Sequence, residues 1–201
     1  MQKHIVNGVM CNSLSISGQD IVTSADSSVT SLHCDVSGGG ADGGHLLVAG
    51  FGDGTVRVFD RRMASSDASV LTFREHATCI VAARLREGSG GLKVVSAEAG
   101  GKVKVWSCAA PEQSRRNVEI KCPLTSAAVH EHCDVFAIAS QQQFIGVLSE
   151  AGAALSTIKY HDGFMGQRIA PVTCMAFHPY KVRACYLYGL PSLQGTRMSP
   201  A

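Results

Sequence analysis

The stretch FGDGTVRVFD, residues 51–60, decides the fold class of this 201-residue chain. Val56 and Val58 alternate with Arg57, which is the period-two pattern of a β-strand and not the three-to-four spacing of a helix. The GDG before this run is a tight-turn signal, in which the Asp53 carboxylate is expected to accept backbone hydrogen bonds. The stretch therefore predicts a strand that follows a tight turn.

The same arrangement returns twice, as AGGKVKVWS at 99–107 and QQQFIGVLS at 141–149. Each copy has an apolar run before it and an outer run after it. The apolar runs are HLLVAG (45–50), KVVSAE (93–98) and VFAIAS (135–140), and the outer runs are SVLTF (69–73), NVEI (117–120) and ALSTIKY (154–160). Four short strands per unit, joined by Gly and Asp turns, are typical of the blades of a WD-type β-propeller.

The first strand of each unit gives the period. Its anchor residues are Val29, Ile80, Ser126 and Val172, spaced by 51, 46 and 46 residues. The prediction is therefore an all-β, WD-type propeller over 1–179 that is incomplete, with three full four-stranded blades and two partial ones. The full blades are expected at about 27–73, 77–120 and 123–160, a partial blade is expected from 170, and a remnant of a preceding blade is expected before 27.

The final segment, 180–201, has little alternation and is interrupted by Pro191, Gly195 and Pro200. We expect it to be a divergent, disordered tail.

Composition excludes several classes of partner and compartment. Lys and Arg total 18 against 16 Asp and Glu, so the formal charge of +2 gives no electrostatic case for nucleic acid. No apolar run is long enough for a secretory signal or a membrane helix, and we expect a soluble, cytoplasmic chain without membrane insertion. The eight cysteines form no compact framework, and we expect them to be reduced and mostly buried.

Polar residues inside the repeats have structural explanations. His76, Ser96 and Trp106 fit the buried hydrogen-bond chain of a WD-type blade, although AGG (99–101) stands where that chain usually takes an Asp. A catalytic base at His76 would need a nucleophile at a matched spacing, and none accompanies it.

Two further motifs resemble ligand sites only in part. His130, His132 and Cys133 are residue types that bind zinc, but no CxxC or second pair completes a tetrahedral set. The glycine-rich 38–44 lacks the Lys and Ser or Thr of a phosphate loop. We therefore expect no metal and no cofactor.

The loop YHDGFMGQR at 160–168 is unusually rich in large and charged side chains for a connection between strands. Such residues on a loop point to contact with a partner. The candidate partner-binding residues are Tyr160, His161, Asp162, Phe164, Met165, Gln167 and Arg168. The alternative is a self-contained loop, in which Phe164 and Met165 pack on their own blade and Arg168 pairs with Asp162.

Four segments together resemble the carboxy-terminal WD-repeat domain of the raptor family, the regulatory-associated subunits of TOR complex one. They are FGDGTVRVFDRRMA (51–64), TFREHATCIV (72–81), IKYHDGFMGQR (158–168) and CMAFHP (174–179), and the resemblance covers about 20–179. It implies a seven-bladed propeller in a scaffold that holds the TOR kinase and other complex members in nutrient signalling, in the cytoplasm and at the lysosomal surface. The family's amino-terminal conserved domain and helical repeats have no counterpart in this sequence.

Two functions from different classes remain open. The first is a non-catalytic interaction module of a raptor-type scaffold. The second is an unrelated WD-repeat propeller that binds a ligand or acts as an enzyme through its central channel. The second needs convergent ionisable side chains at the strand starts, and the sequence supplies only scattered ones.

Overall fold

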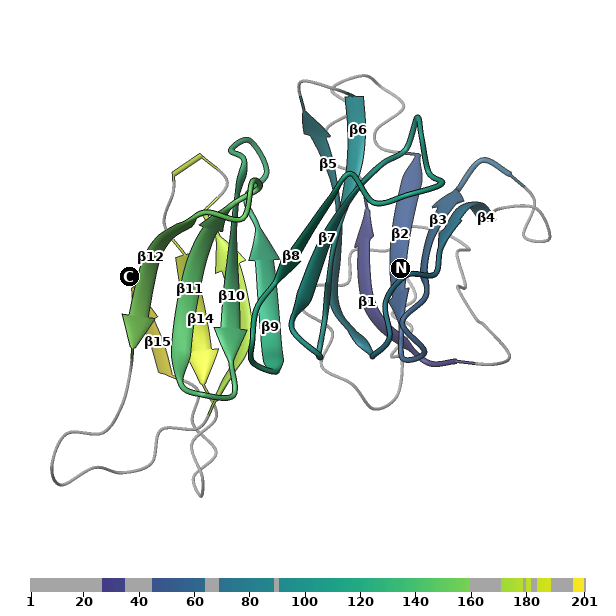
Figure 1. Ribbon diagram of the computed structural model, residues 1–201. Helices are drawn as coiled ribbons and strands as arrows, with labels where there is room; N and C mark the ends of the chain where they lie inside the picture. Colours follow the sequence, from purple (N-terminus) through teal and green to yellow (C-terminus); the bar gives the residue numbers. More distant parts are fainter. Residues whose placement is uncertain are drawn as a thin grey trace, which may run out of the picture.

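The structure, a computed structural model, is built from β-strands and turns (Figure 1). It describes residues 27–34, 45–63, 69–88, 91–159, 171–178, 180–181, 184–188 and 197–200. No helix occurs in these ranges, and therefore none that could span a membrane.

The strands form four antiparallel sheets that follow one another along the chain (Figure 1). Sheet 1 contains β1 (Val29–Cys34), β2 (Leu46–Phe51), β3 (Val56–Asp60) and β4 (Ser69–Phe73). Sheet 2 contains β5 (Ile80–Gly88), β6 (Gly91–Glu98), β7 (Lys102–Ser107) and β8 (Arg116–Glu119). Sheet 3 contains β9 (Leu124–Val129), β10 (Val135–Ser140), β11 (Phe144–Ser149) and β12 (Ala154–Lys159). Sheet 4 contains β13 (Val172–Phe177), β14 (Ala184–Tyr188) and β15 (Arg197–Pro200).

In every sheet the strand order follows the chain order, so each sheet is a simple meander of the kind that makes a propeller blade. The predicted all-β, WD-type architecture is confirmed. Within 180–201, predicted to be a disordered tail, the structure describes two strands, β14 and β15, while 182–183, 189–196 and 201 lie outside the described residues. The apolar and aromatic residues ACYLY of β14 pair along β13, for example Tyr186 opposite Met175. Pro200 is tolerated because it lies on β15, at the edge of its sheet.

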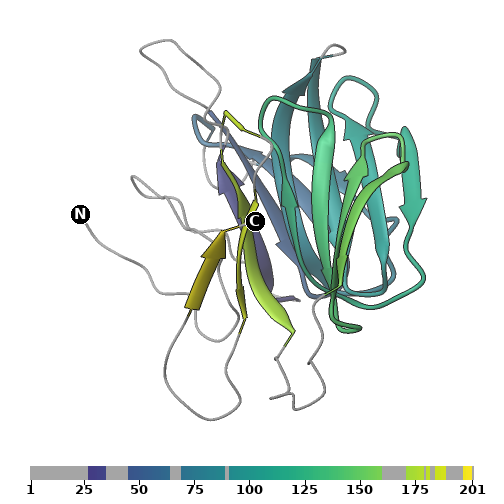
Figure 2. The same ribbon diagram turned by 90° about the vertical axis from the view of Figure 1, so that its left-hand side faces the viewer.

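Hydrophobic cores lie between consecutive sheets, which stack face to face (Figure 2). Val103 and Val105 belong to the core shared with sheet 3, whereas Trp106 belongs to the core shared with sheet 1. Lys104 is also only 7% exposed, because neighbouring sheets cover both faces of sheet 2.

The innermost strands of sheets 1 and 2 are joined by side chains. The Thr30 hydroxyl donates a hydrogen bond of 2.6 Å to the Ile80 carbonyl, and the Ala83 amide donates one of 2.9 Å to the Ser31 hydroxyl. These bonds satisfy backbone groups of β5 that its own sheet leaves unpaired at this inner edge, so the sheets are held in a fixed relation.

The expectation of mostly buried cysteines is wrong for the described residues. Cys122 is buried and Cys185 is exposed, while the remaining five described cysteines are half-buried. Most of them lie at strand ends or in turns, where one side of the residue meets solvent. Burial raises the pKa of the Cys108 thiol to about 11, which makes it unreactive at neutral pH.

Candidate functional site

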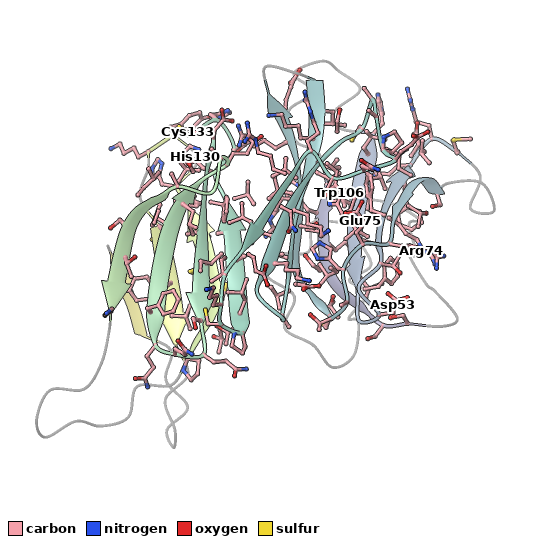
Figure 3. All side chains as sticks on the ribbon, in the orientation of Figure 1. Asp53, Arg74, Glu75, Trp106, His130 and Cys133 are labelled. Carbon is pink, nitrogen blue, oxygen red and sulfur yellow. The ribbon has the colours of Figure 1, made fainter. Side chains whose placement is uncertain are left out.

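A chain of buried hydrogen bonds crosses sheet 2 beneath Trp106, which is labelled in Figure 3. The Trp106 indole Nε1 donates to Ser96 Oγ at 2.8 Å, and Ser96 Oγ lies 2.7 Å from His76 Nε2. On its other side, His76 Nδ1 lies 3.2 Å from Glu98 Oε2. The structure therefore brings the three residues named from the sequence into one chain and adds Glu98 as its end.

The direction of these bonds follows from the state of His76. Burial lowers the pKa of His76 below its usual value of 6.5 and outweighs the attraction of Glu98, so the ring is neutral at pH 7. Nδ1–H then donates to Glu98, and Nε2 accepts the Ser96 hydroxyl proton. In this arrangement the indole nitrogen of Trp106, the Ser96 hydroxyl and both ring nitrogens of His76 each have a hydrogen-bond partner.

The sequence pattern of a WD-type blade predicts an Asp in this turn, where AGG (99–101) stands, and so did not predict a role for Glu98. Its carboxylate also accepts from the backbone amides of Ala77 at 2.8 Å and Thr78 at 3.3 Å. It therefore joins sheet 2 to the connection between β4 and β5. An acidic residue closing the apolar run KVVSAE was the available signal, since a carboxylate is rarely buried without partners.

Ser96, His76 and Glu98 are also the residue types of a serine hydrolase triad, with matching bonds. Accessibility decides against that chemistry. Ser96 is fully buried, its oxygen already accepts the indole proton, and the Phe73 ring stacks on Trp106 with 4.6 Å between centroids. No substrate carbonyl can approach this hydroxyl in the folded state, so the arrangement is structural.

Asp53 organises the turn between β2 and β3. Its Oδ1 accepts the Thr55 amide at 2.8 Å, and its own amide donates to the Ser27 hydroxyl at 3.0 Å. Burial alone would raise the pKa of Asp53, but the hydrogen bonds from Thr55 lower it below its usual value. Gly54 has a φ of 86°, and a Cβ there would lie 2.6 Å from the His76 carbonyl oxygen. The turn is therefore packed closely against the connection that carries His76.

A partly buried ion pair extends this arrangement. The Lys104 ammonium donates to Glu75 at 2.7 Å and lies 5.7 Å from the centre of the Trp106 ring. The Ser114 hydroxyl donates to the same carboxylate at 2.9 Å. The hydrogen bond from Lys104, helped by Ser114, lowers the pKa of Glu75. Glu75 therefore ties the β4–β5 connection to the turn after β7.

A second charged cluster joins sheets 2 and 3, and no sequence pattern predicts it. We call Arg86, Lys93, Asp134 and Glu150 the inter-sheet clasp. Glu150 accepts from Lys93 at 2.8 Å and from Arg86 at 3.3 Å, and Arg86 also pairs with Asp134. Arg86 is only 5% exposed, whereas the Asp134 side chain is 64% exposed. Only the fold brings these residues together, because they are separated by up to 64 positions in the chain.

His130 explains the segment that resembled a zinc motif. Its Nδ1 accepts from the amides of His132 at 3.1 Å and Cys133 at 3.0 Å, and its Nε2 lies 3.3 Å from the Lys181 carbonyl. Both ring nitrogens are therefore occupied by backbone groups (Figure 3 labels His130 and Cys133). Within the described part of the chain, no three His, Cys, Asp or Glu residues are placed to share a metal ion.

The loop at 160–168 lies outside the described residues. The structure fixes only its flanks, since β12 ends at Lys159 and β13 begins at Val172. Its seven candidate partner-binding residues remain predictions.

Comparison with known proteins gives a consistent result. No family model matches the chain. Over 164 residues it is 38% identical to "Protein raptor homolog" of Dictyostelium discoideum, which covers 82% of this chain. It is 31% identical over 157 residues to "Target of rapamycin complex 1 subunit mip1" of Schizosaccharomyces pombe, which covers 78% of this chain. The chain is a relative of the raptor proteins.

Solved structures agree with this relationship. The crystal structure of Chaetomium thermophilum Raptor superposes on this chain with a TM-score of 0.67 and 28% sequence identity. The matched region is 81% of this chain and 14% of the Raptor chain. A chain of the mitotic checkpoint complex superposes with a TM-score of 0.61 and 15% sequence identity. The matched region is 83% of this chain and 45% of the other chain, and at this identity the similarity supports the fold alone. The present chain spans about a tenth of the length of the curated raptor relatives.

Proposed function

We propose that this raptor-like chain is a non-catalytic interaction module of a TOR complex one scaffold in nutrient signalling. The observation that supports the proposal is its similarity to raptor proteins over about four-fifths of its length, one of which is described as a TOR complex 1 subunit. Its partners are proteins, namely the TOR kinase and other complex members. Its proposed location is the cytoplasm and, within the complex, the lysosomal surface.

The physical chemistry of the described residues supports a role without catalysis. The most reactive set of residue types, Ser96, His76 and Glu98, is sealed in the interior, where it holds a blade together. The Cys108 thiol has a pKa of about 11 and is not a nucleophile at neutral pH. Buried polar networks of this kind stabilise a unique packing arrangement.

The surface proposed to contact the complex is the 160–168 loop. It connects the outer strand of sheet 3 to the inner strand of sheet 4, and connections of this type lie on one face of a propeller, where partners can reach them. Phe, Met and Arg are enriched at protein interfaces, and the loop contains all three.

The test is a pull-down with a full-length raptor-type protein that carries this domain. Phe164→Ala combined with Arg168→Ala should reduce recovery of the TOR kinase and other complex members more than tenfold, because interface anchors contribute about 2 kcal/mol or more. Leu155→Ala, which removes an exposed side chain from β12, is the matched control and should leave recovery unchanged. Undiminished recovery with the double variant would exclude the loop as the contact.

The enzymatic alternative has one observation in its favour, the triad-like set around Ser96. A fluorophosphonate probe tests it directly, since such probes react with activated serine hydroxyls. We expect no labelling of the folded chain. Labelling that disappears in Ser96→Ala would establish a serine hydrolase and overturn the non-catalytic assignment.

A further inference from the structure

Two histidines at the junction of sheets 3 and 4 close backbone turns with a ring nitrogen. His130, directly after β9, accepts the backbone amides of His132 at 3.1 Å and Cys133 at 3.0 Å on its Nδ1. His178, directly after β13, accepts the Tyr180 amide on its Nδ1 at 3.1 Å. In both turns a ring nitrogen takes the place of the Asn or Asp oxygen of an Asx turn. The two histidines therefore hold equivalent turns of neighbouring sheets.

The two turns also contact each other. The rings of His132 and Tyr180 stack with 5.6 Å between centroids and planes 20° apart. His130 Nε2 lies 3.3 Å from the carbonyl of Lys181, the residue that follows Tyr180. The His130 ring packs at 60° against Phe177 at the end of β13, with 5.3 Å between centroids. We give the name histidine joint to the set His130, His132, His178 and Tyr180.

The hydrogen bonds fix the protonation state of the two turn-closing rings. A ring nitrogen that accepts a backbone N–H uses its lone pair, so the same nitrogen cannot also carry a hydrogen. In His130 the other nitrogen then carries the hydrogen and donates it to the Lys181 carbonyl. A second proton on either ring would point one N–H at another, and His130 is in addition only 1% exposed, where a charge is costly. The closed joint therefore excludes the charged form of both rings.

Histidine is the group that changes charge here near neutral pH. Imidazoles ordinarily titrate between about pH 7.5 and about pH 5.5, whereas carboxylates, thiols, phenols and amines ordinarily titrate outside that range. Arg183 follows in the second turn, and its side chain lies outside the described residues. The other charged or titratable groups on the two turns and the elements beside them are Glu131, Cys133, Asp134, Lys181, and Arg86, Lys93 and Glu150 of the inter-sheet clasp.

We propose that the histidine joint is an acid-sensitive contact between sheets 3 and 4, which opens when Nδ1 of His130 and Nδ1 of His178 each take up a proton from water. Protonation of His130 releases the amides of His132 and Cys133. Protonation of His178 releases the amide of Tyr180, so each half of the stacked pair loses its backbone support. This inference goes beyond the proposed function and does not depend on which complex the chain joins.

The test is hydrogen exchange of single amides in the whole chain, followed by NMR from about pH 7.5 to about pH 5.5 and corrected for the intrinsic pH dependence of exchange. Protection of the His132, Cys133 and Tyr180 amides should fall with pH. The loss should approach about tenfold per pH unit below about pH 6.5, because each opening binds one proton. The Ala137 amide is the reference and should stay protected, since this buried residue lies on β10, which is paired on both sides.

Asparagine variants separate the two histidines. The Asn side chain keeps an acceptor oxygen for the amide two residues later, and it does not titrate. His130→Asn should make the protection of the His132 and Cys133 amides independent of pH. The decline at Tyr180 should remain in that variant, and His178→Asn should give the reverse pattern. His132→Gln is the matched control and should leave both declines in place, because its ring accepts neither amide.

The reference amide distinguishes opening of the joint from unfolding of the chain. An equal loss of protection at Ala137 would overturn the proposal, because the whole chain would then be unfolding. Protection that does not change with pH, or that declines unchanged in both Asn variants, would also overturn it. If His130→Asn has already lost protection at neutral pH, His178→Asn decides the outcome, since it changes an exposed residue. None of these results would alter the outcome of the TOR complex pull-down.

Discussion

Replacing Glu98 by Ala tests the buried network at the residue that closes it. The change removes the acceptor for His76 Nδ1 and for the amides of Ala77 and Thr78. The Nδ1–H group of His76 is buried, and leaving it without an acceptor should cost about 1–3 kcal/mol of stability. The two amides belong to exposed residues and can turn to water, so they add less. We expect the free energy of unfolding to fall by about 2–4 kcal/mol.

The assay is urea unfolding followed by Trp106 fluorescence, which reports directly on the network. Glu119→Ala is the matched control, because this carboxylate lies on the exposed outer strand β8 and its loss should change stability by less than about 0.5 kcal/mol. Glu98→Gln should fall between the two, since the amide keeps one acceptor oxygen. Equal midpoints for Glu98→Ala and Glu119→Ala, at equal slopes, would refute the reasoning.

Three further outcomes are expected. Asp53→Ala should lower the unfolding free energy by about 1–2 kcal/mol in a thermal melt, because the Thr55 amide loses its acceptor, and an unchanged melting temperature would show that the turn does not need the carboxylate. The pKa of His76 in the folded chain is below 6.5, so its contribution to stability is complete above about pH 6.5. Below that pH the free energy of unfolding should fall, because the unfolded chain binds the proton more readily than the folded chain. Urea midpoints measured against pH should show this decline, and His76→Gln should flatten it. Glu150→Gln should cost about 3 kcal/mol by leaving two buried cations without their shared anion, whereas a loss within about 0.5 kcal/mol would mean that the clasp is solvated.

Periodicity predicted the sheets well because it is a local property. Alternation in TVRVFD and KVKVWS, together with the glycine turns before them, sets strand and turn positions with no knowledge of distant residues. Repetition of the unit then gave the architecture, since each blade needs a neighbour to cover its faces. The same pattern could not show that Lys104 is buried, because that depends on which sheet packs against it.

The contacts that join the blades were not predictable in the same way. The inter-sheet clasp links Arg86 to Glu150, 64 residues later, and no local pattern distinguishes them from ordinary surface charges. Glu98 was missed for a different reason: the expected residue was an Asp in the turn, where AGG (99–101) stands, whereas Glu98 is the last residue of β6. Strand β14 was not predicted because Pro191 and Gly195, which interrupt strands, follow it closely. The Tyr and Leu residues of β14 itself favour a strand.

The most direct test of the proposed role as an interaction module is crosslinking inside the assembled complex. A photoreactive amino acid is placed at Phe164 in a full-length raptor-type protein that carries this domain, and separately at Leu155 on β12 as the control position. Mass spectrometry then identifies what each position touches. The proposal predicts crosslinks from position 164 to the TOR kinase or another complex member, and few or none from position 155. Crosslinks from position 164 that reach only residues of the same chain would contradict it, because the loop would then pack on its own blade and serve no partner.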